Sequence, residues 1–197
     1  MRPVRALALL LPTLLAACAE DPGTGRVAGS LSVPACEAGE PLEATCPPEV
    51  PAESCEAFDL QADFFALEPY GEGVLMRFQK GGRILALTDA LVLTIGDHRL
   101  LRGNLGRSLP VGPDENIRGA LGLFHICPDS TQSYAIHGLV RFDAFGVDKN
   151  DEVRGVLERL EVRDGRSEGG VGQLLGVLHG HFDFQVHKGR PYQPFAE

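Results

Sequence analysis

The sequence predicts an all-β domain, an antiparallel β-sandwich of jelly-roll type with eight or more strands, and an up-and-down β-barrel is the alternative. Three observations support this fold class. Short apolar runs alternate with turn residues, several runs show a period of two, and no long run shows a helical period. The 24 glycines among 197 residues agree with it, because glycine weakens the interior of helices.

Eight apolar runs mark the expected strands in chain order. They cover residues 30–34, 58–67, 73–79, 90–95, 117–126, 134–142, 153–162 and 172–186. Clusters of Gly, Pro, Asn, Asp and Ser separate many of these runs, at 72–73, 80–82, 111–114, 128–130, 148–151 and 164–166. Short strands at such spacing, with turns between them, are typical of a sandwich or a barrel.

The run 153–162 illustrates the period of two. Strict alternation places Val156, Glu158, Leu160 and Val162 on one face, and Leu157, Arg159, Glu161 and Arg163 on the other. The second face is mostly charged, so we expect this strand to be half exposed, as strands of antiparallel sheets commonly are.

The first residues form a secretion signal. A start with two arginines is followed by the apolar stretch 6–15, which is too short to cross a bilayer. The signal ends in Leu15-Ala16-Ala17-Cys18, which resembles the lipobox of bacterial lipoproteins. The resemblance implies cleavage before Cys18 and attachment of lipid to its side chain, where several acyl chains make a stable anchor. We therefore expect a signal peptide at 1–17, a tether at 18–28 and one domain at 29–197.

The lipobox resemblance also implies a location. In lipoproteins an Asp after the cysteine favours retention in the inner membrane, whereas Ala19 stands here, so we expect an outer-membrane protein of the bacterial envelope. The chain resembles Gram-negative lipoproteins of unknown function that share the motif at 58–65, Phe-Asp-Leu-x-x-Asp-Phe-Phe, and a closing Gly-x-Phe-x-Phe-x-Val strand at 180–186. That resemblance implies a lipid anchor and a β-sandwich-like domain, and no activity.

Charge limits the partners. The whole chain has a net charge of -9, and removal of Arg2 and Arg5 with the signal leaves 16 basic and 27 acidic residues, a net charge of -11. An acidic domain repels nucleic acid, so we expect no nucleic-acid partner. The same charge leads us to expect that the lipid anchor, and not the protein surface, holds the chain to the membrane.

Four cysteines follow the anchor, Cys36, Cys46, Cys55 and Cys127. An even number in an exported protein predicts two disulfides, for which three pairings are possible. We expect one bridge within the Pro- and Glu-rich segment that contains the first three, and another from this segment to Cys127. A zinc site is disfavoured because the close CxxC pairs that such sites use are absent.

The best candidate for a site is the run at 178–187. Alternation places His179, His181 and Asp183 on one face, and Gly180, Phe182, Phe184 and Val186 on the core face. Two histidines two residues apart on a strand can bind one metal ion, and Asp183 can act as a further ligand.

This run resembles the His-x-His motif of cupins, which are metal-binding β-barrels. The resemblance implies a divalent metal at His179 and His181, but the glutamate of cupins falls here at Gln185 or Val186. The competing interpretation is the polar outer face of a half-buried strand.

The functional expectation follows from these features. Neither a Gly-x-Ser-x-Gly motif nor a phosphate-binding glycine loop is present in the sequence. We expect a lipid-anchored, non-catalytic binding or structural module without a cofactor, whose partner is an envelope protein or a glycan. The alternative is a cupin-like metal-binding protein or metalloenzyme that uses His179 and His181.

Overall fold

The structure, a computed structural model, describes residues 23–37, 40–51, 54, 56–81, 88–127, 133–165 and 172–186. Their secondary structure is almost entirely β, which confirms the predicted all-β class. The expected signal peptide 1–17 and Cys18 lie outside the described residues. No helix in the described ranges is long and apolar enough to cross a lipid bilayer.

The described residues form eleven strands and one short helix. Their bounds are β1 (Thr24–Glu37), β2 (Glu40–Ala44), β3 (Phe58–Gln61), β4 (Phe64–Tyr70), β5 (Gly73–Gly81), β6 (Thr88–Ile95), α1 (Arg99–Arg102), β7 (Ser108–Val111), β8 (Ile117–Leu123), β9 (Ser133–Phe145), β10 (Glu152–Asp164) and β11 (Gln173–Gln185). The strand order is β2-β1-β11-β10-β9-β7-β8-β6-β5-β4, with β3 paired to β1. All eight expected runs contain strands.

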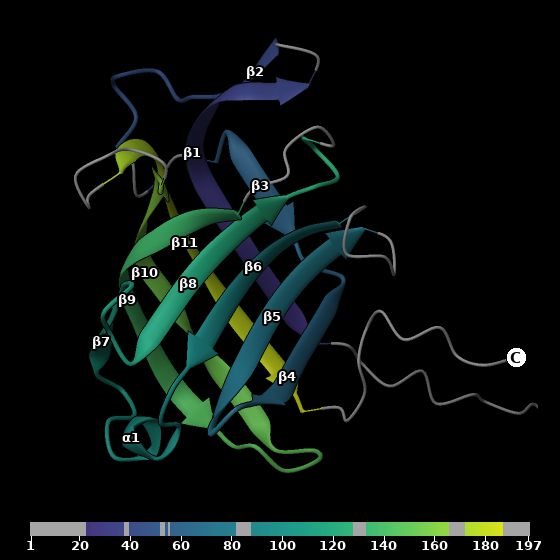
Figure 1. The fold of residues 1–197 in the computed structure, drawn as a ribbon, viewed down its shortest axis with the longest axis vertical. Coiled ribbons are helices and arrows are strands. Elements are labelled where there is room, and N and C mark those ends of the chain that lie inside the picture. Colours follow the sequence, from purple (N-terminus) through teal and green to yellow (C-terminus); the bar gives the residue numbers. More distant parts are fainter. Residues whose placement is uncertain are drawn as a thin grey trace, which may run out of the picture.

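These strands form one large sheet that curls into a half-barrel (Figure 1). The division into two sheets that a sandwich requires is therefore not confirmed. The pairings are antiparallel except between β7 and β8, which makes the sheet mixed. The curl and the sequential order of most strands are features of the alternative prediction, an up-and-down barrel.

A break between β3 and β4 brings the two ends of the curled sheet together. Strand β3 pairs with β1, and β4, which follows after only two residues, pairs with β5. At the break, the backbone N–H of Ala62 donates to Gly25 O at 3.3 Å and that of Asp63 donates to Gln79 O at 3.0 Å. The expected single strand 58–67 is thus two strands that bridge opposite ends of the sheet.

Phenylalanine rings fill part of the interior of the curl. Phe65 of β4 stacks on Phe184 of β11 with ring centroids 5.3 Å apart, and Phe182 packs on Phe78 of β5 at 5.2 Å and on Phe142 of β9 at 5.5 Å. Strands β4 and β5 lie far from β11 in the sheet order, so their ring contacts with β11 hold opposite walls of the curl together, whereas β9 is separated from β11 by β10 alone.

The start of the fold differs from the expectation. Strand β1 begins at Thr24, inside the expected tether 18–28, and Val27 and Ala28 are buried. The reason is its pairing, since β1 lies between β11 on one side and β3 and β2 on the other. Small, polar residues that look like a linker in sequence are therefore part of the sheet.

Strict alternation fails in β10. Leu157 pairs with Gly180 while Leu160 pairs with Leu178, so β10 has one extra residue at this point, a β-bulge. The bulge turns Leu157 and Leu160 to the same side, where both are buried. The expectation that Leu157 lies on the charged outer face is wrong for this reason.

One end of the molecule gathers several chain segments, and we call it the α1 end. Strand β1 begins there and β11 ends there, because Thr24 pairs with Asp183. The loop between β9 and β10 lies beside them, with the N–H of Asn150 donating to Val186 O. Helix α1 follows β6 at this same end, at the bottom of Figure 1, and the loop after it contacts β9 through Gly106 N–H and Phe142 O.

Candidate functional site

The expected histidine face lies on the outer side of β11. Phe182, Phe184 and Val186 are buried, whereas His181 and Asp183 are exposed and His179 is half-buried, so the predicted alternation is confirmed here. Pairing places His181 opposite Arg26 of β1, and His179 opposite Ala28.

Arg26 is the centre of an ion-pair network on this face. Its Nε and Nη2 atoms donate to the two carboxylate oxygens of Asp59 at 2.8 and 3.1 Å, and its Nη1 donates to Glu56 at 2.9 Å. Gln61 donates to the same carboxylate at 2.8 Å. The hydrogen bonds from Arg26 hold the pKa of Asp59 below its ordinary value, and those from Asp59 and Glu56 raise the pKa of Arg26.

The two histidines share a recess of about 150 Å³ with two members of the network; its lining is Arg26, Ala28, Glu56, His179, Gly180 and His181. The structure thus brings His179 and His181 together. The Nδ1 atom of His179 is buried and has no hydrogen-bond partner in the described part of the chain. The positive charge of Arg26 in the same recess is balanced by its two ion-pair partners, Asp59 and Glu56.

Asp183 does not join this recess. It pairs with Thr24 and Arg154 in the sheet and is absent from the lining. Within the described ranges, no group of three or more His, Cys, Asp or Glu side chains is arranged to hold a metal ion.

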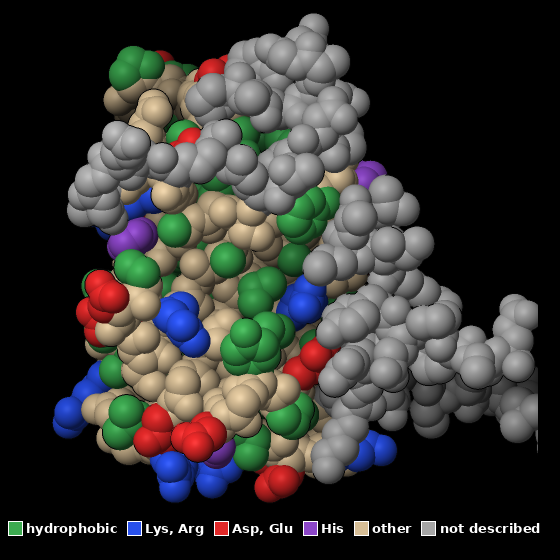
Figure 2. Space-filling model, viewed as in Figure 1, with side chains coloured by type: hydrophobic (Ala, Val, Ile, Leu, Met, Phe, Trp, Pro, Cys, Tyr) green, Lys and Arg blue, Asp and Glu red, His purple; other side chains and the backbone are tan. Residues whose placement is uncertain are grey.

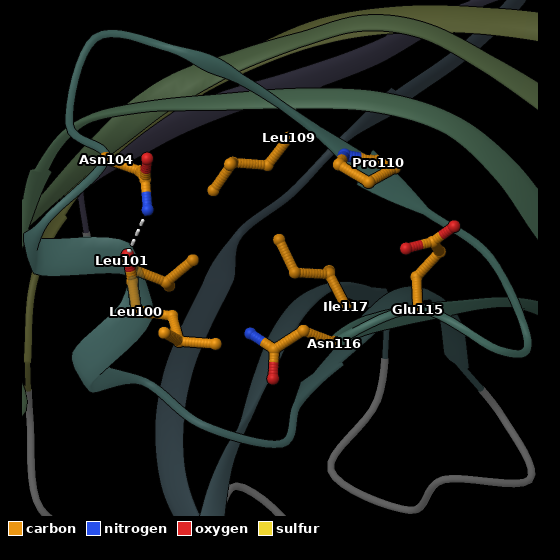
Figure 3. A pocket seen from close by; sticks show the side chains of 8 residues that line it. All are labelled: Leu100, Leu101, Asn104, Leu109, Pro110, Glu115, Asn116 and Ile117. Atoms are coloured by element: carbon orange, nitrogen blue, oxygen red, sulfur yellow. Dashed lines mark hydrogen bonds between the residues drawn. The ribbon is translucent and has the colours of Figure 1, made fainter.

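A second hollow, which the sequence did not predict, lies between α1, β7 and the start of β8 (Figure 3). It measures about 140 Å³ and is mostly apolar, with Leu100, Leu101, Asn104, Leu109, Pro110, Glu115, Asn116 and Ile117 as its lining. We call it the α1 pocket. Leu101 and Ile117 of this lining are buried, and Leu100 is 53% exposed. A hollow of this size and lining accepts a small apolar group.

Side-chain hydrogen bonds fix the walls of the α1 pocket. Asn104 Nδ2 donates to Leu100 O at 2.8 Å, the dashed line in Figure 3, and closes the turn after α1. Asn116 Oδ1 accepts from Asp97 N–H at 2.7 Å, and its Nδ2 donates to Asp97 O at 3.1 Å. The start of β8 is thereby tied to the segment that leads into α1.

Three arginines close in sequence to the lining of the α1 pocket form no ion pair among the described residues. Most arginines on the rest of the described surface form ion pairs, as Arg26, Arg141, Arg154, Arg159 and Arg163 do. In the described ranges, no ion pair joins Arg102, Arg107 or Arg118 to another residue, and all three are exposed. Arg118 pairs in register with Thr94, just before the end of β6. Figure 2 shows basic, acidic and apolar side chains gathered at this end of the molecule.

Cys46 and Cys127 lie at the end of the strands opposite the α1 end. Cys127 follows β8 and is fully buried, and Cys46 follows β2 and is half-buried; neither is a free, titrating thiol. The side chains of Cys36 and Cys55 lie outside the described residues. The predicted pairing therefore stays a prediction.

The sequence contains one feature that could have indicated the α1 pocket. Residues 98–107 read His-Arg-Leu-Leu-Arg-Gly-Asn-Leu-Gly-Arg, with three leucines, three arginines and no acidic residue. In a chain of net charge -9, such a stretch is a local departure from the average. Comparison of the chain with protein-family models, curated proteins and solved structures gives no match.

Proposed function

We propose that this chain is a lipid-anchored protein of the bacterial envelope, held in the outer membrane through Cys18, whose β domain acts as a non-catalytic binding module. The observation that carries the binding role is the α1 pocket, an apolar hollow at the surface with a half-exposed leucine beside it. Open apolar hollows with a few polar groups around them are typical ligand sites.

The interior supports a surface site over an internal one. Rings from β4, β5, β9 and β11 meet across the curl, so these walls pack on each other instead of enclosing a ligand there. The ligand group that the α1 pocket accepts is small and apolar, and Arg102, Arg107 and Arg118, which form no ion pair with another described residue, favour a negative charge beside it.

Binding of 1-anilinonaphthalene-8-sulfonate, which combines apolar rings with one sulfonate, tests this role. We expect saturable fluorescence enhancement that is lost in Leu100→Ser and kept in Leu174→Ser, because Leu174 is exposed to a similar extent, 48%, and lines no part of the α1 pocket. Equal binding by the two variants would contradict the assignment of the pocket.

The second candidate function is binding of a divalent metal at His179 and His181. The buried Nδ1 of His179, which has no hydrogen-bond partner in the described part of the chain and lies in the recess shared with His181, favours it, whereas Asp183, the third expected ligand, does not line that recess. Metal content of the folded protein, compared with that of a His179→Ala, His181→Ala double variant, distinguishes the two. An equimolar ion that the double variant loses would support the metal site.

We also propose that Cys36, Cys46, Cys55 and Cys127 form two disulfides. The absence of a free thiol at Cys46 and Cys127 supports this. Alkylation of the unfolded, unreduced protein tests it, with no modified cysteine expected among the four before reduction and four modified cysteines afterwards.

A further inference from the structure

The α1 end carries an unusual combination of side chains. Leu100 and Leu105 are 53% and 42% exposed, and Arg102, Arg107 and Arg118 are exposed close to them in sequence or in the sheet. Segments that lie on membranes combine exposed apolar side chains, which enter the boundary between headgroups and acyl chains, with basic side chains that meet the phosphates.

Arg102, Arg107 and Arg118 differ from most other described arginines, which form ion pairs with carboxylates. Arg99 is paired with Asp97 at 3.2 Å, so that carboxylate is already engaged. In the part of the chain that the structure describes, no ion pair connects Asp114 or Glu115 to Arg102, Arg107 or Arg118. The three guanidinium groups therefore remain available to an external anion.

The position of the start of β1 indicates which end of the domain faces the membrane, and this step rests on the proposed lipid anchor at Cys18. Five residue steps separate Cys18 from Gly23, so the chain between them spans at most about 18 Å, whatever its conformation. Strand β1 starts at the α1 end. An anchor at Cys18 therefore keeps this end of the domain close to the lipid surface.

We infer that the α1 end is a membrane-contact surface that binds anionic phospholipid. Arg102, Arg107 and Arg118 meet the headgroup phosphates, Leu100 and Leu105 enter the interface, and the α1 pocket takes the end of an acyl chain. Although the chain as a whole is acidic, the contact depends on charges within a Debye length of the surface, about 8 Å at physiological salt. Each arginine at an anionic surface strengthens binding severalfold.

Vesicle binding by the unlipidated protein tests this contact. We would use the mature chain 18–197 with Cys18→Ser, and vesicles of equal parts phosphatidylglycerol and phosphatidylethanolamine, with phosphatidylcholine vesicles as the neutral comparison. We expect binding to the anionic vesicles alone, weakened about tenfold or more in Arg102→Glu, Arg107→Glu. Leu100→Ser, Leu105→Ser should weaken it as well.

Matched controls exclude effects of charge or hydrophobicity in general. Arg159→Glu, Arg163→Glu, toward the end of β10 that pairs with Leu174, changes the net charge equally, and Leu174→Ser removes one exposed leucine at that same end, so both should bind like the parent protein. Equal losses in the control pair and the test pair would overturn the inference. Absence of vesicle binding by the parent would also overturn it, and would favour an acidic protein as the partner of these arginines instead. Because the test protein has no lipid, failure of the Cys18 proposal leaves this result unaffected.

Discussion

Arg26 and Asp59 join β1 to β3 through a two-point ion pair, with Nε–Oδ1 and Nη2–Oδ2 distances of 2.8 and 3.1 Å. The two residues lie diagonally across the strand pair, since Arg26 pairs with Gln61 and Ala28 with Asp59. Because β3 leads directly into β4, this ion pair helps to hold the bridge between the two ends of the curled sheet.

The ion pair predicts a specific dependence of stability on acid. The folded pKa of Asp59 lies below its unfolded value, so its contribution is fully present above the unfolded pKa and is lost as the pH falls through the folded pKa. Asp59→Asn should lower the free energy of unfolding by about 1 kcal/mol near neutral pH and by little at about pH 2.

Urea unfolding of the wild type and Asp59→Asn across this acid range measures the difference. Glu152→Gln is the control, because Glu152 and Arg154 form a more exposed pair at the start of β10. An acid-induced loss of stability that is equal in the wild type and Asp59→Asn would contradict the assigned role.

Asp89 predicts a second dependence of stability on pH, opposite in direction to that of Asp59. It is 1% exposed, and its Oδ1 accepts the N–H groups of His125 and Ile126 at 3.1 Å each. Burial raises its pKa, so the folded protein binds this proton more tightly than the unfolded chain, and stability should fall as the pH rises from the unfolded pKa through the folded one.

Two substitutions separate the charge of Asp89 from its hydrogen bonds. Asp89→Asn keeps an acceptor oxygen and removes the charge, so it should abolish this pH dependence and stay within about 1 kcal/mol of the wild type at neutral pH. Asp89→Leu leaves the two N–H groups without their acceptor and should cost about 1–3 kcal/mol. Urea unfolding measures the stability of both variants. Equal losses of stability in the two would show that the fold depends on the charge of Asp89 and not on its acceptor oxygen.

Gly155 predicts a packing effect. A Cβ atom at this position would lie 2.6 Å from the Phe182 ring and would collide with the carbonyl oxygen of Arg141. Gly155→Ala should therefore destabilise the domain by about 2–3 kcal/mol. Gly165→Ala is the control, because a Cβ there meets nothing within 4 Å, and it should change thermal stability little. Equal melting temperatures for the two variants would contradict the packing account.

The sequence allowed prediction of the strands with clear patterns. In β11 the alternation of Phe182, Phe184 and Val186 with polar residues gives both the strand and its core face, because one side of the sheet is buried. Strand β7 was missed because it has four residues and includes Pro110, and α1 was missed because four residues show no helical period.

The features of the two sites that could not be predicted depend on pairing between strands that are far apart in the sequence. That His179 and His181 share a face follows from their spacing, but the placement of Arg26 opposite His181 depends on the register of β1 with β11, which are strands from the two ends of the chain. The α1 pocket likewise depends on β7 and β8 lying beside a short helix. The bulge in β10 interrupts the alternation of its side chains, and the sequence pattern does not show where such a bulge occurs.

The mass of the protein extracted from membranes tests the central claim most directly. The account predicts a chain that begins at Cys18, with acyl groups on that residue and no residues from 1–17, and a Cys18→Ser variant that is no longer membrane-bound. A chain that keeps residues 1–17, or one cleaved elsewhere with an unmodified Cys18, would contradict it.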